Sequence, residues 1–502
     1  MTIDFTRVPV IAGAGQHTNR EANPTVAPDP FDLMETAART AAASALLPDG
    51  PAAFTHIWMV HSLSLRHADP AGALARRLGA ERVEARCSGM GGSIPQWLVD
   101  RAADEVAKGG QPRILIVGAE ALATRRRAKK AGVRLHWPTS EGWPETWPPI
   151  EADFGVNLVE RTHGLEQATT MYALIESALA HVAGHDPATH RLAIGRLMER
   201  CNEVATHNPN AWFPTQRSAD ELTTVSTENR MICWPYPKYV NAVMEVDMAA
   251  AVVVTDATTA RQWGLGRHEV AYIAGWADAK EVWYLSERPE VHRSPALAAC
   301  TASALDSAGL GAEDIEGFDL YACFPSSIEV ARQTLGLAQT DPRPLTLTGG
   351  LPYHGGPGSN YVTHALVNTL NWLRAGKGES VLVHGNGFFL TTHSVGVYRS
   401  NDPSAHAPAP DDQLQHRLDA AATTLPVDDS AEGSATVVAA TVPYDRAGDA
   451  QAGIVLLDAG GRRTLARTTA ELTAAVMETD PVGLRVEVGP APQGPGNLAA
   501  LG

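Results

Sequence analysis

The residues best suited to chemistry gather in a glycine-rich stretch, Thr348 to Leu366, which reads TGGLPYHGGPGSNYVTHAL. The stretch carries His354 and runs into apolar residues spaced as on one face of a helix. Such a loop lets a ligand approach backbone N–H groups, and a helix start adds partial positive charge. This chemistry suits a thioester oxyanion or a phosphate. A tight connection in which His354 and Tyr361 only pack and cap is the alternative.

Three more polar segments stand where strands are expected to end. They are the loop CSGMGGS from Cys87 to Ser93, the segment YACF from Tyr321 to Phe324, and the sequence HGNG from His384 to Gly387. In α/β sheets, ligands bind at the carboxyl ends of the strands. We therefore expect these segments to converge with the glycine-rich stretch on one pocket.

The elements that must position these segments alternate between strand and helix. In the first half, strands are expected near residues 8–13, 56–60 and 114–118, with helices near 32–43, 71–78 and 95–108. In the second half, strands are expected near 270–274, 317–321 and 380–384, with helices near 295–307, 328–335 and up to 373. A glycine loop, a helix, a glycine turn and a buried strand recur in both halves. The pattern predicts a duplicated α/β unit with a largely parallel sheet.

Composition narrows the function classes. The 502 residues carry a formal net charge of −16, which argues against a general nucleic-acid role. No signal sequence or apolar run of membrane length is evident, so no membrane association and a cytoplasmic location are expected. The five cysteines are scattered without C-x-x-C spacing, which argues against a disulfide framework and against a structural zinc site. No metal site and no bound cofactor are expected.

The predicted domain organisation has four parts. Residues 1–265 form a first half, with an insertion at about 121–246, and residues 266–400 form a second half. Residues 401–412 read as a linker, and residues 413–502 as a small all-β barrel. The insertion holds tryptophans among prolines at 137–147, which either cover the pocket and line an acyl site or pack locally. It also holds the basic run Arg125, Arg126 and Arg127, which either meets a coenzyme A phosphate or is a solvated helix face.

These motifs together resemble the thiolase superfamily over about residues 5 to 400. The motifs are the two glycine loops, GAEAL at 118–122, EVDMAAAVVV at 245–254, YACF, and HGNG. The nearest resemblance is to the thiolase-like proteins of type 1 of actinobacteria, which are related to sterol-carrier-protein-type thiolases and end in a small β-barrel. The implied fold class is α/β: a duplicated thiolase fold of two βαβαβαββ halves, layered α-β-α-β-α, with a C-terminal small antiparallel β-barrel.

The resemblance also implies a nucleophile and a base, and the chain departs from the family at both. The nucleophilic cysteine of thiolases falls at Gly92, with Cys87 five residues upstream and Ser93 adjacent. The family's catalytic histidine falls at Gly356, and His354 stands two residues earlier. Thiolase activity on acetoacetyl-CoA or acetyl-CoA is therefore not expected.

The remaining family motifs are also altered. Tyr321, before Cys323, replaces the side chain that helps to form an oxyanion hole. The final Cys-x-Gly motif falls near residues 383–387, where His384 and Asn386 supply polar groups instead.

Two functions are compatible with this pattern. The first is an acyl-CoA-handling protein of acyltransferase type, with chemistry by His354, His384, Tyr321, Cys323, Cys87 or Ser93. The second is a catalytically silent acyl-CoA-binding or partner protein. The expected substrate-binding residues are Gly91, Gly92, Gly356, Ser359, Asn360, Asn386 and Trp143. Coenzyme A would be substrate or ligand, and the chain a monomer or homodimer.

Overall fold

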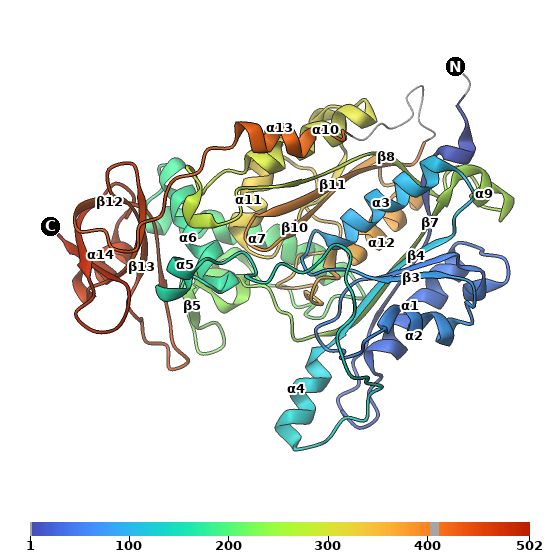
Figure 1. Cartoon of the computed structure of the whole chain (residues 1–502), viewed down its shortest axis with the longest axis horizontal. Coiled ribbons are helices and arrows are strands. Elements are labelled where there is room, and N and C mark those ends of the chain that lie inside the picture. Colours follow the sequence, from blue (N-terminus) through green and yellow to red (C-terminus); the bar gives the residue numbers. More distant parts are fainter. Residues whose placement is uncertain (1–2, 402–410) are drawn as a thin grey trace.

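The computed structural model describes residues 3–401 and 411–502 (Figure 1). The linker expected at 401–412 therefore lies almost wholly outside the described residues. In the first half, the strands are β1 (Pro9–Thr18), β2 (His56–Met59), β3 (Glu84–Cys87), β4 (Ile114–Ala121) and β7 (Asp247–Asp256). In the second half, they are β8 (Ala271–Lys280), β9 (Gly317–Asp319), β10 (Ser380–Gly387) and β11 (Thr392–Arg399).

The strand order confirms the duplication. The nine strands form one mixed sheet in the order β3-β2-β4-β7-β1-β8-β11-β10-β9. Only the outer pairs β3–β2, β2–β4 and β10–β9 are parallel, and the five central pairs are antiparallel, so the expectation of a largely parallel sheet is wrong. Starting from the centre, β1-β7-β4-β2 is matched by β8-β11-β10-β9, while β3 has no counterpart strand among the described residues. The two halves meet at β1 and β8, which pair only at Val10 and Ile11. The seam between the two halves of the sheet is therefore short.

Helices cover both faces of the sheet. The helices of the first half are α1 (Pro30–Ser44), α2 (Pro70–Leu78), α3 (Ile94–Lys108), α4 (Leu122–Ala131) and α9 (Ala257–Gln262). Those of the second are α10 (Pro295–Ala308), α11 (Pro325–Thr334) and α12 (Tyr361–Arg374). Helices α3 and α12 contact each other and strands of both halves, so they form a central layer. Helices α1 and α10 pack on the first and second half respectively, and α4 projects from the body (Figure 1).

Local sequence explains where the central helices begin and end. Pro95 stands in the first turn of α3, where its missing N–H costs no hydrogen bond. Gly109 ends α3 with a φ of 89°, a conformation that a β-carbon disfavours. Apolar residues such as Leu98 and Leu366 lie fully buried on the core-facing sides of α3 and α12. The glycine-rich loops that precede both helices are thus held at the centre of the molecule.

The insertion does more than cover the sheet. It holds α5 (Leu158–Thr162), α6 (Ala168–Val182), α7 (Pro187–His207), α8 (Ala219–Thr223), β5 (Met231–Trp234) and β6 (Tyr236–Pro237). Strand β5 pairs with β12 (Gly433–Pro443) of the C-terminal region, at Trp234 and Val442. Helix α6 also packs on β12, and the backbone N–H of Ala440 donates to Ser177 Oγ at 2.9 Å. The insertion therefore anchors the C-terminal β-domain to the body (Figure 1).

The C-terminal region forms the expected small β-barrel, and it has five strands. Strands β12, β13 (Ile454–Asp458), β14 (Arg463–Thr468), β16 (Asn497–Leu501) and β15 (Arg485–Pro490) close because β12 pairs with both β13 and β15. The pairing is antiparallel except between β14 and β16. The sequence pattern missed β16 and the helices α13 (Leu414–Ala421) and α14 (Ala470–Glu478). Across the described residues, no helix is long and apolar enough to cross a membrane.

Candidate functional site

The start of α3 faces the segment that follows β9. A β-carbon added at Gly92 would lie closer than 3.0 Å to the hydroxyl and the ring of Tyr321, and 2.5 Å from the carbonyl oxygen of Asn386. The phenol of Tyr321 is 7% exposed, and burial raises the pKa of its hydroxyl far above the ordinary value. The space into which a side chain at position 92 would point is therefore already filled by a neutral tyrosine.

The position expected for the family's histidine is filled in the same way. A β-carbon on Gly356 would lie 2.8 Å from the side chain of Leu351. In the final motif, a β-carbon on Gly385 would lie 2.9 Å from the backbone of Ser93. Separations this short force the surroundings to move. Each of these three glycines thus makes room for a neighbour that is already packed in place.

The two glycine-rich loops meet as predicted. The N–H of Gly91 donates to Ser359 Oγ at 3.0 Å, which joins the loop before α3 to the loop before α12. Asn360 donates from Nδ2 to the carbonyl of Gly118 at 2.7 Å. Ser93 Oγ shares a hydrogen bond of 2.8 Å with Thr392 Oγ1. The side chains of Ser359, Asn360 and Ser93 therefore hold the loops together through hydrogen bonds.

His354 is buried beneath the second loop. Its Nδ1 lies 3.2 Å from the carbonyl oxygen of Gly355, so Nδ1 carries the proton, while Nε2 is buried without a hydrogen-bond partner. Burial lowers the pKa of His354 to about 4. Its ring stands edge-on to those of Tyr361 and His364, at centroid distances of 5.8 and 4.9 Å. Tyr361 also contacts Tyr321 at 5.7 Å, so His354 and Tyr321 lie in one cluster.

Cys323 lies in a buried polar group of its own. Burial raises the pKa of the Cys323 thiol to about 12, against the opposing effect of the hydroxyls of Ser327 and Tyr172. Asn386 donates from Nδ2 to Tyr172 Oη at 2.8 Å and to Ser327 Oγ at 3.2 Å. The ring of Tyr172 stacks on Phe324 at 4.7 Å. Aromatic rings and hydroxyl groups thus surround the thiol.

His384 is turned toward the outer layer of the second half. Its Nε2 lies 3.1 Å from His393 Nδ1, and His393 Nε2 lies 3.0 Å from Ser294 Oγ. Burial lowers the pKa of His384 to about 3. Because neighbouring Gly385 faces Ser93, the side chain of His384 points to the opposite face of β10. His384 is therefore not brought to the start of α3, where it was expected to act with Tyr321.

The remaining candidates lie at the surface or in the core. Trp143 is 70% exposed and stacks near Arg66. Cys87 is buried, and burial raises the pKa of its thiol to about 12. Strand β3, which ends at Cys87, bridges to Thr146, so the tryptophan segment lies beside that strand. The end of the tryptophan segment thus lies against the first glycine loop, where Trp147 packs on Trp97 of α3, whereas Trp143 itself is exposed.

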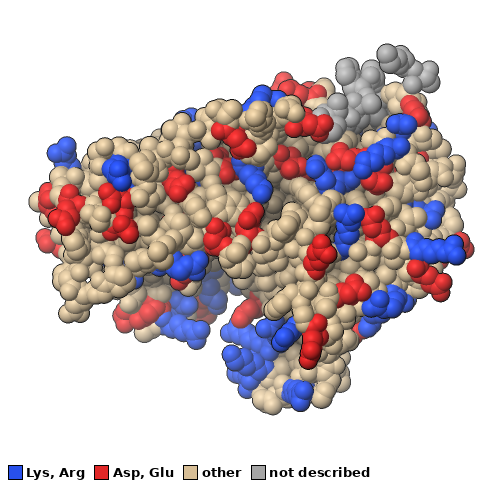
Figure 2. Space-filling view, viewed as in Figure 1, with Lys and Arg blue, Asp and Glu red and all other residues tan. Residues whose placement is uncertain are grey.

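The basic helix α4 carries both structural and free charges. Arg127 pairs with the fully buried carboxylate of Asp247 at 2.5 Å, and Arg126 pairs with Glu245. Arg125 donates to the carbonyl of Leu63 at 2.8 Å. Figure 2 shows acidic and basic side chains mixed over one face, with basic side chains gathered at the lower edge where α4 projects. Arg125 and Arg126 remain accessible to a ligand.

Five cavities have no contribution from Gly92, Tyr321 or His354 to their walls. One of them, of about 610 Å³, is lined by Cys87 and Trp147 and so borders the start of the first glycine loop. Within residues 3–401 and 411–502, no three His, Cys, Asp or Glu side chains are grouped to hold a metal ion. Around Gly92 and Gly356, the convergent loops meet in a packed cluster.

Comparisons with known proteins agree with this architecture. Residues 413–492 match the family model described as "Thiolase-like protein type 1 additional C-terminal domain". A monomeric SCP2-thiolase-like protein type 1 from Mycobacterium smegmatis is 30% identical, with a TM-score of 0.83 and coverage of 100% of both chains. The chain belongs to the thiolase-like proteins of type 1. No curated protein sequence matches it.

More distant structures show the shared fold of the thiolase superfamily. Acetyl-CoA acetyltransferase from Syntrophomonas wolfei is 13% identical, with a TM-score of 0.55 over 78% of this chain and 99% of that one. Human mitochondrial 3-ketoacyl-CoA thiolase in complex with CoA is 14% identical, with a TM-score of 0.51 over 80% of this chain and 100% of that one. For this thiolase-like protein, they support the duplicated α/β fold and the resemblance over the first 400 residues.

Sequence reasoning missed the residues that fill the site. Tyr172 and Ser327 carry no motif, and only contacts between segments distant in sequence bring them to the glycine loops. Leu351 lies within the second glycine-rich loop, but its type gave no sign that it fills the space beside Gly356. Gly356 and Gly92 gave a partial signal, since an unexpected glycine implies a close neighbour. Nothing in the sequence named that neighbour.

Proposed function

We propose that this thiolase-like protein binds a coenzyme A thioester without performing thiolase chemistry. The observation that carries the proposal is the filling of three positions: Tyr321 faces Gly92, Leu351 faces Gly356, and the backbone of Ser93 faces Gly385. Thiolytic catalysis needs a thiolate with a base in hydrogen-bond reach. Here, neither side chain fits without displacing packed atoms.

The cysteines support the same proposal. Burial raises the pKa of Cys87, Cys201, Cys233 and Cys323 to about 12, and that of Cys300 well above its ordinary value. A reactive cysteine has a lowered pKa and partial exposure. All five thiols are buried, so none has the character of a nucleophile.

The scaffold retains features that suit the ligand. The N-termini of α3 and α12 meet in the central layer, and Arg125 and Arg126 leave positive charge accessible on an acidic chain. A helix start and exposed arginines are suited to carbonyl and phosphate oxygens. The human relative bound to CoA makes this ligand class the natural one to test.

The test is calorimetric titration with CoA, acetyl-CoA and a longer acyl-CoA, together with assays of acetoacetyl-CoA cleavage and acetyl-CoA condensation. We expect binding and no turnover above background. Replacing Arg125 and Arg126 by alanine should weaken CoA binding, more so at low salt. Arg39→Ala, an exposed arginine of α1 paired with Glu35, is the matched control. If no CoA compound binds at millimolar concentration, the proposal that the protein binds a CoA thioester is wrong. Robust turnover would contradict the proposal that it performs no thiolase chemistry.

One observation favours a second candidate, an acyl transfer of a different type. Nε2 of His354 is buried without a hydrogen-bond partner, which is costly for a polar atom. A neutral imidazole nitrogen is a competent proton acceptor. Acyl-CoA hydrolysis or transfer that is lost in His354→Gln, with CoA affinity retained, would favour this candidate.

A further inference from the structure

A cavity of about 330 Å³ lies between α6, α7 and α11, in a part of the molecule unrelated to the glycine loops. At about 30 Å³ per water molecule, it has room for roughly eleven waters, or a ligand of about ten non-hydrogen atoms. Its apolar wall comes from residues such as Leu179, Ile194 and Leu197. Buried polar side chains stand opposite, so the cavity has one apolar and one polar side.

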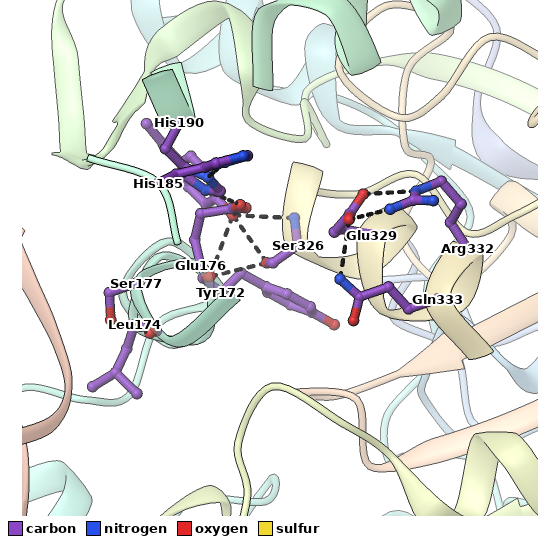
Figure 3. A network of polar contacts seen from close by, with 11 residues as sticks. Tyr172, Leu174, Glu176, Ser177, His185, His190, Ser326, Glu329, Arg332 and Gln333 are labelled. Carbon is purple, nitrogen blue, oxygen red and sulfur yellow. Dashed lines mark hydrogen bonds and ion pairs between the residues drawn. The ribbon is translucent and has the colours of Figure 1, made fainter. Parts of the chain in front are cut away.

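A hydrogen-bonded chain forms the base of the polar side. Figure 3 shows Glu176 between His190 and the start of α11. Glu176 Oε1 lies 2.6 Å from His190 Nε2, and Oε2 accepts from the hydroxyl of Tyr236. Tyr236 is bonded in turn to Ser326 of α11 at 2.9 Å. Both oxygens of the buried carboxylate are therefore satisfied from within the protein.

The imidazole of His190 lies between Glu176 and His185 at the cavity wall. Burial opposes the charged form, but the hydrogen bond and the charge of Glu176 outweigh it and raise the pKa of His190. Its Nδ1 lies 3.3 Å from Nδ1 of His185. In its protonated form, which the raised pKa favours, His190 donates there, and the N–H of His185 is then on Nε2. The half-buried His185 thus offers a donor at the cavity wall.

The carboxylates in the cavity wall are paired with basic side chains, whereas two arginines in the wall have no carboxylate partner in the described chain. Glu329 binds Arg332 through both oxygens, at 2.9 and 2.5 Å. Arg200 donates only to backbone carbonyls, those of Asp341 at 2.8 Å and Arg343 at 2.7 Å among them. Arg196 is exposed and has no hydrogen-bond or ion-pair partner among the described residues. The cavity wall therefore carries excess positive charge.

We propose that this cavity binds a small organic carboxylate with an apolar chain of medium length. The carboxylate lies against Arg196 and the N–H of His185, where a guanidinium offers paired donors to two oxygens. The chain lies on Leu179, Ile194 and Leu197. This assignment is independent of CoA binding, since the wall shares no residue with the glycine loops or α4.

Calorimetric titration of the full chain with octanoate, octanol and octylamine tests the proposal. We expect octanoate to bind and the neutral and cationic analogues to bind at least about tenfold more weakly. Arg196→Ala should reduce octanoate affinity by about tenfold, and Arg196→Lys by less. Arg191→Ala is the matched control, because Arg191 is exposed on the same helix and pairs with Asp220 outside the cavity.

A second variant tests the place of binding without removing charge. Ala193 is half-buried in the cavity wall, and Ala193→Trp should block octanoate while leaving the melting temperature close to that of the parent. Three results would overturn the assignment: no octanoate binding at about 10 mM, equal affinity for octanol, or equal losses in the Arg191 and Arg196 variants. Phosphate that displaces octanoate only in the parent would extend the ligand class to other anions at the same arginine.

Discussion

Gly92 offers the sharpest test of the filled site. The φ of Gly92 lies outside the left-handed region, so an L-residue suits its backbone, and any cost of Gly92→Ala arises from contacts. The added methyl would lie closer than 3.0 Å to the Tyr321 ring and hydroxyl, and 2.5 Å from the carbonyl of Asn386. Overpacking of this kind costs about 1–3 kcal/mol. We expect Gly92→Ala to destabilise the protein by that amount.

A double-mutant cycle assigns the cost to Tyr321. Tyr321→Ala alone should cost about 3–5 kcal/mol, as for other buried aromatic side chains. The double variant should be less destabilised than the sum of the two, by about 1–3 kcal/mol, because the space for the new methyl is then vacant. Relief stays partial, since the carbonyl of Asn386 belongs to the backbone. Tyr321→Phe keeps the ring carbon nearest to position 92, so its coupling free energy with Gly92→Ala should be small.

Urea denaturation of the single and double variants measures these differences. Gly489→Ala is the control, because no atom lies within 4 Å of a β-carbon added there, and its effect should stay within about 0.5 kcal/mol. If Gly92→Ala were as mild as this control, the site would be more open than the structure indicates. Strict additivity with Tyr321→Ala would show that another group fills the position.

The buried histidines and thiols give two further expectations. The pKa of His354 falls from 6.5 to about 4 on folding, so the unfolded chain binds more protons between these values and stability is lost as pH falls from about 6.5 to 4. His354→Asn should flatten this slope by up to about 1.4 kcal/mol per pH unit, measured by urea denaturation, and an unchanged slope would place the charge elsewhere. With pKa values near 12 or above, the cysteines should resist a thiol reagent at pH 8 in the native protein and all react in urea. Rapid labelling of one native cysteine would identify a thiol more accessible than we infer.

The sequence predicted the helices and strands in which apolar residues recur at regular spacing. Helix α3 begins within one residue of its expected start and α12 ends within one residue of its expected end, and the order of strands confirms the duplication. The meeting of the glycine loops was also predictable, because equivalent loops follow equivalent strands. Such features depend on patterns within one segment or on symmetry between two.

The remainder depended on contacts that no local pattern records. Strand β16 is short and follows a glycine- and proline-rich turn, so its alternation of apolar and polar residues is weak. Only its pairing with β15 and β14 defines it as a strand. The pairing of β5 with β12 joins Trp234 to Val442, which are 208 positions apart in the chain. The direction of His384 follows from the pleat of β10, where a shift of one residue exchanges the two faces. A short motif in the sequence does not determine that shift.

The packing of the site also explains why the departures from the family occur together. A phenol at Tyr321 requires a residue without a side chain at Gly92, and a bare Gly92 would leave a void that Tyr321 fills. Leu351 and Gly356 are related in the same way, so each loss is compensated by a neighbour. Restoring one family residue alone would therefore overpack the core before it could supply chemistry. Recovery of a working thiolate requires a cysteine at Gly92, a smaller residue at Tyr321 and movement of the Asn386 backbone. These coupled requirements agree with the proposal that the chain binds a thioester without thiolase chemistry.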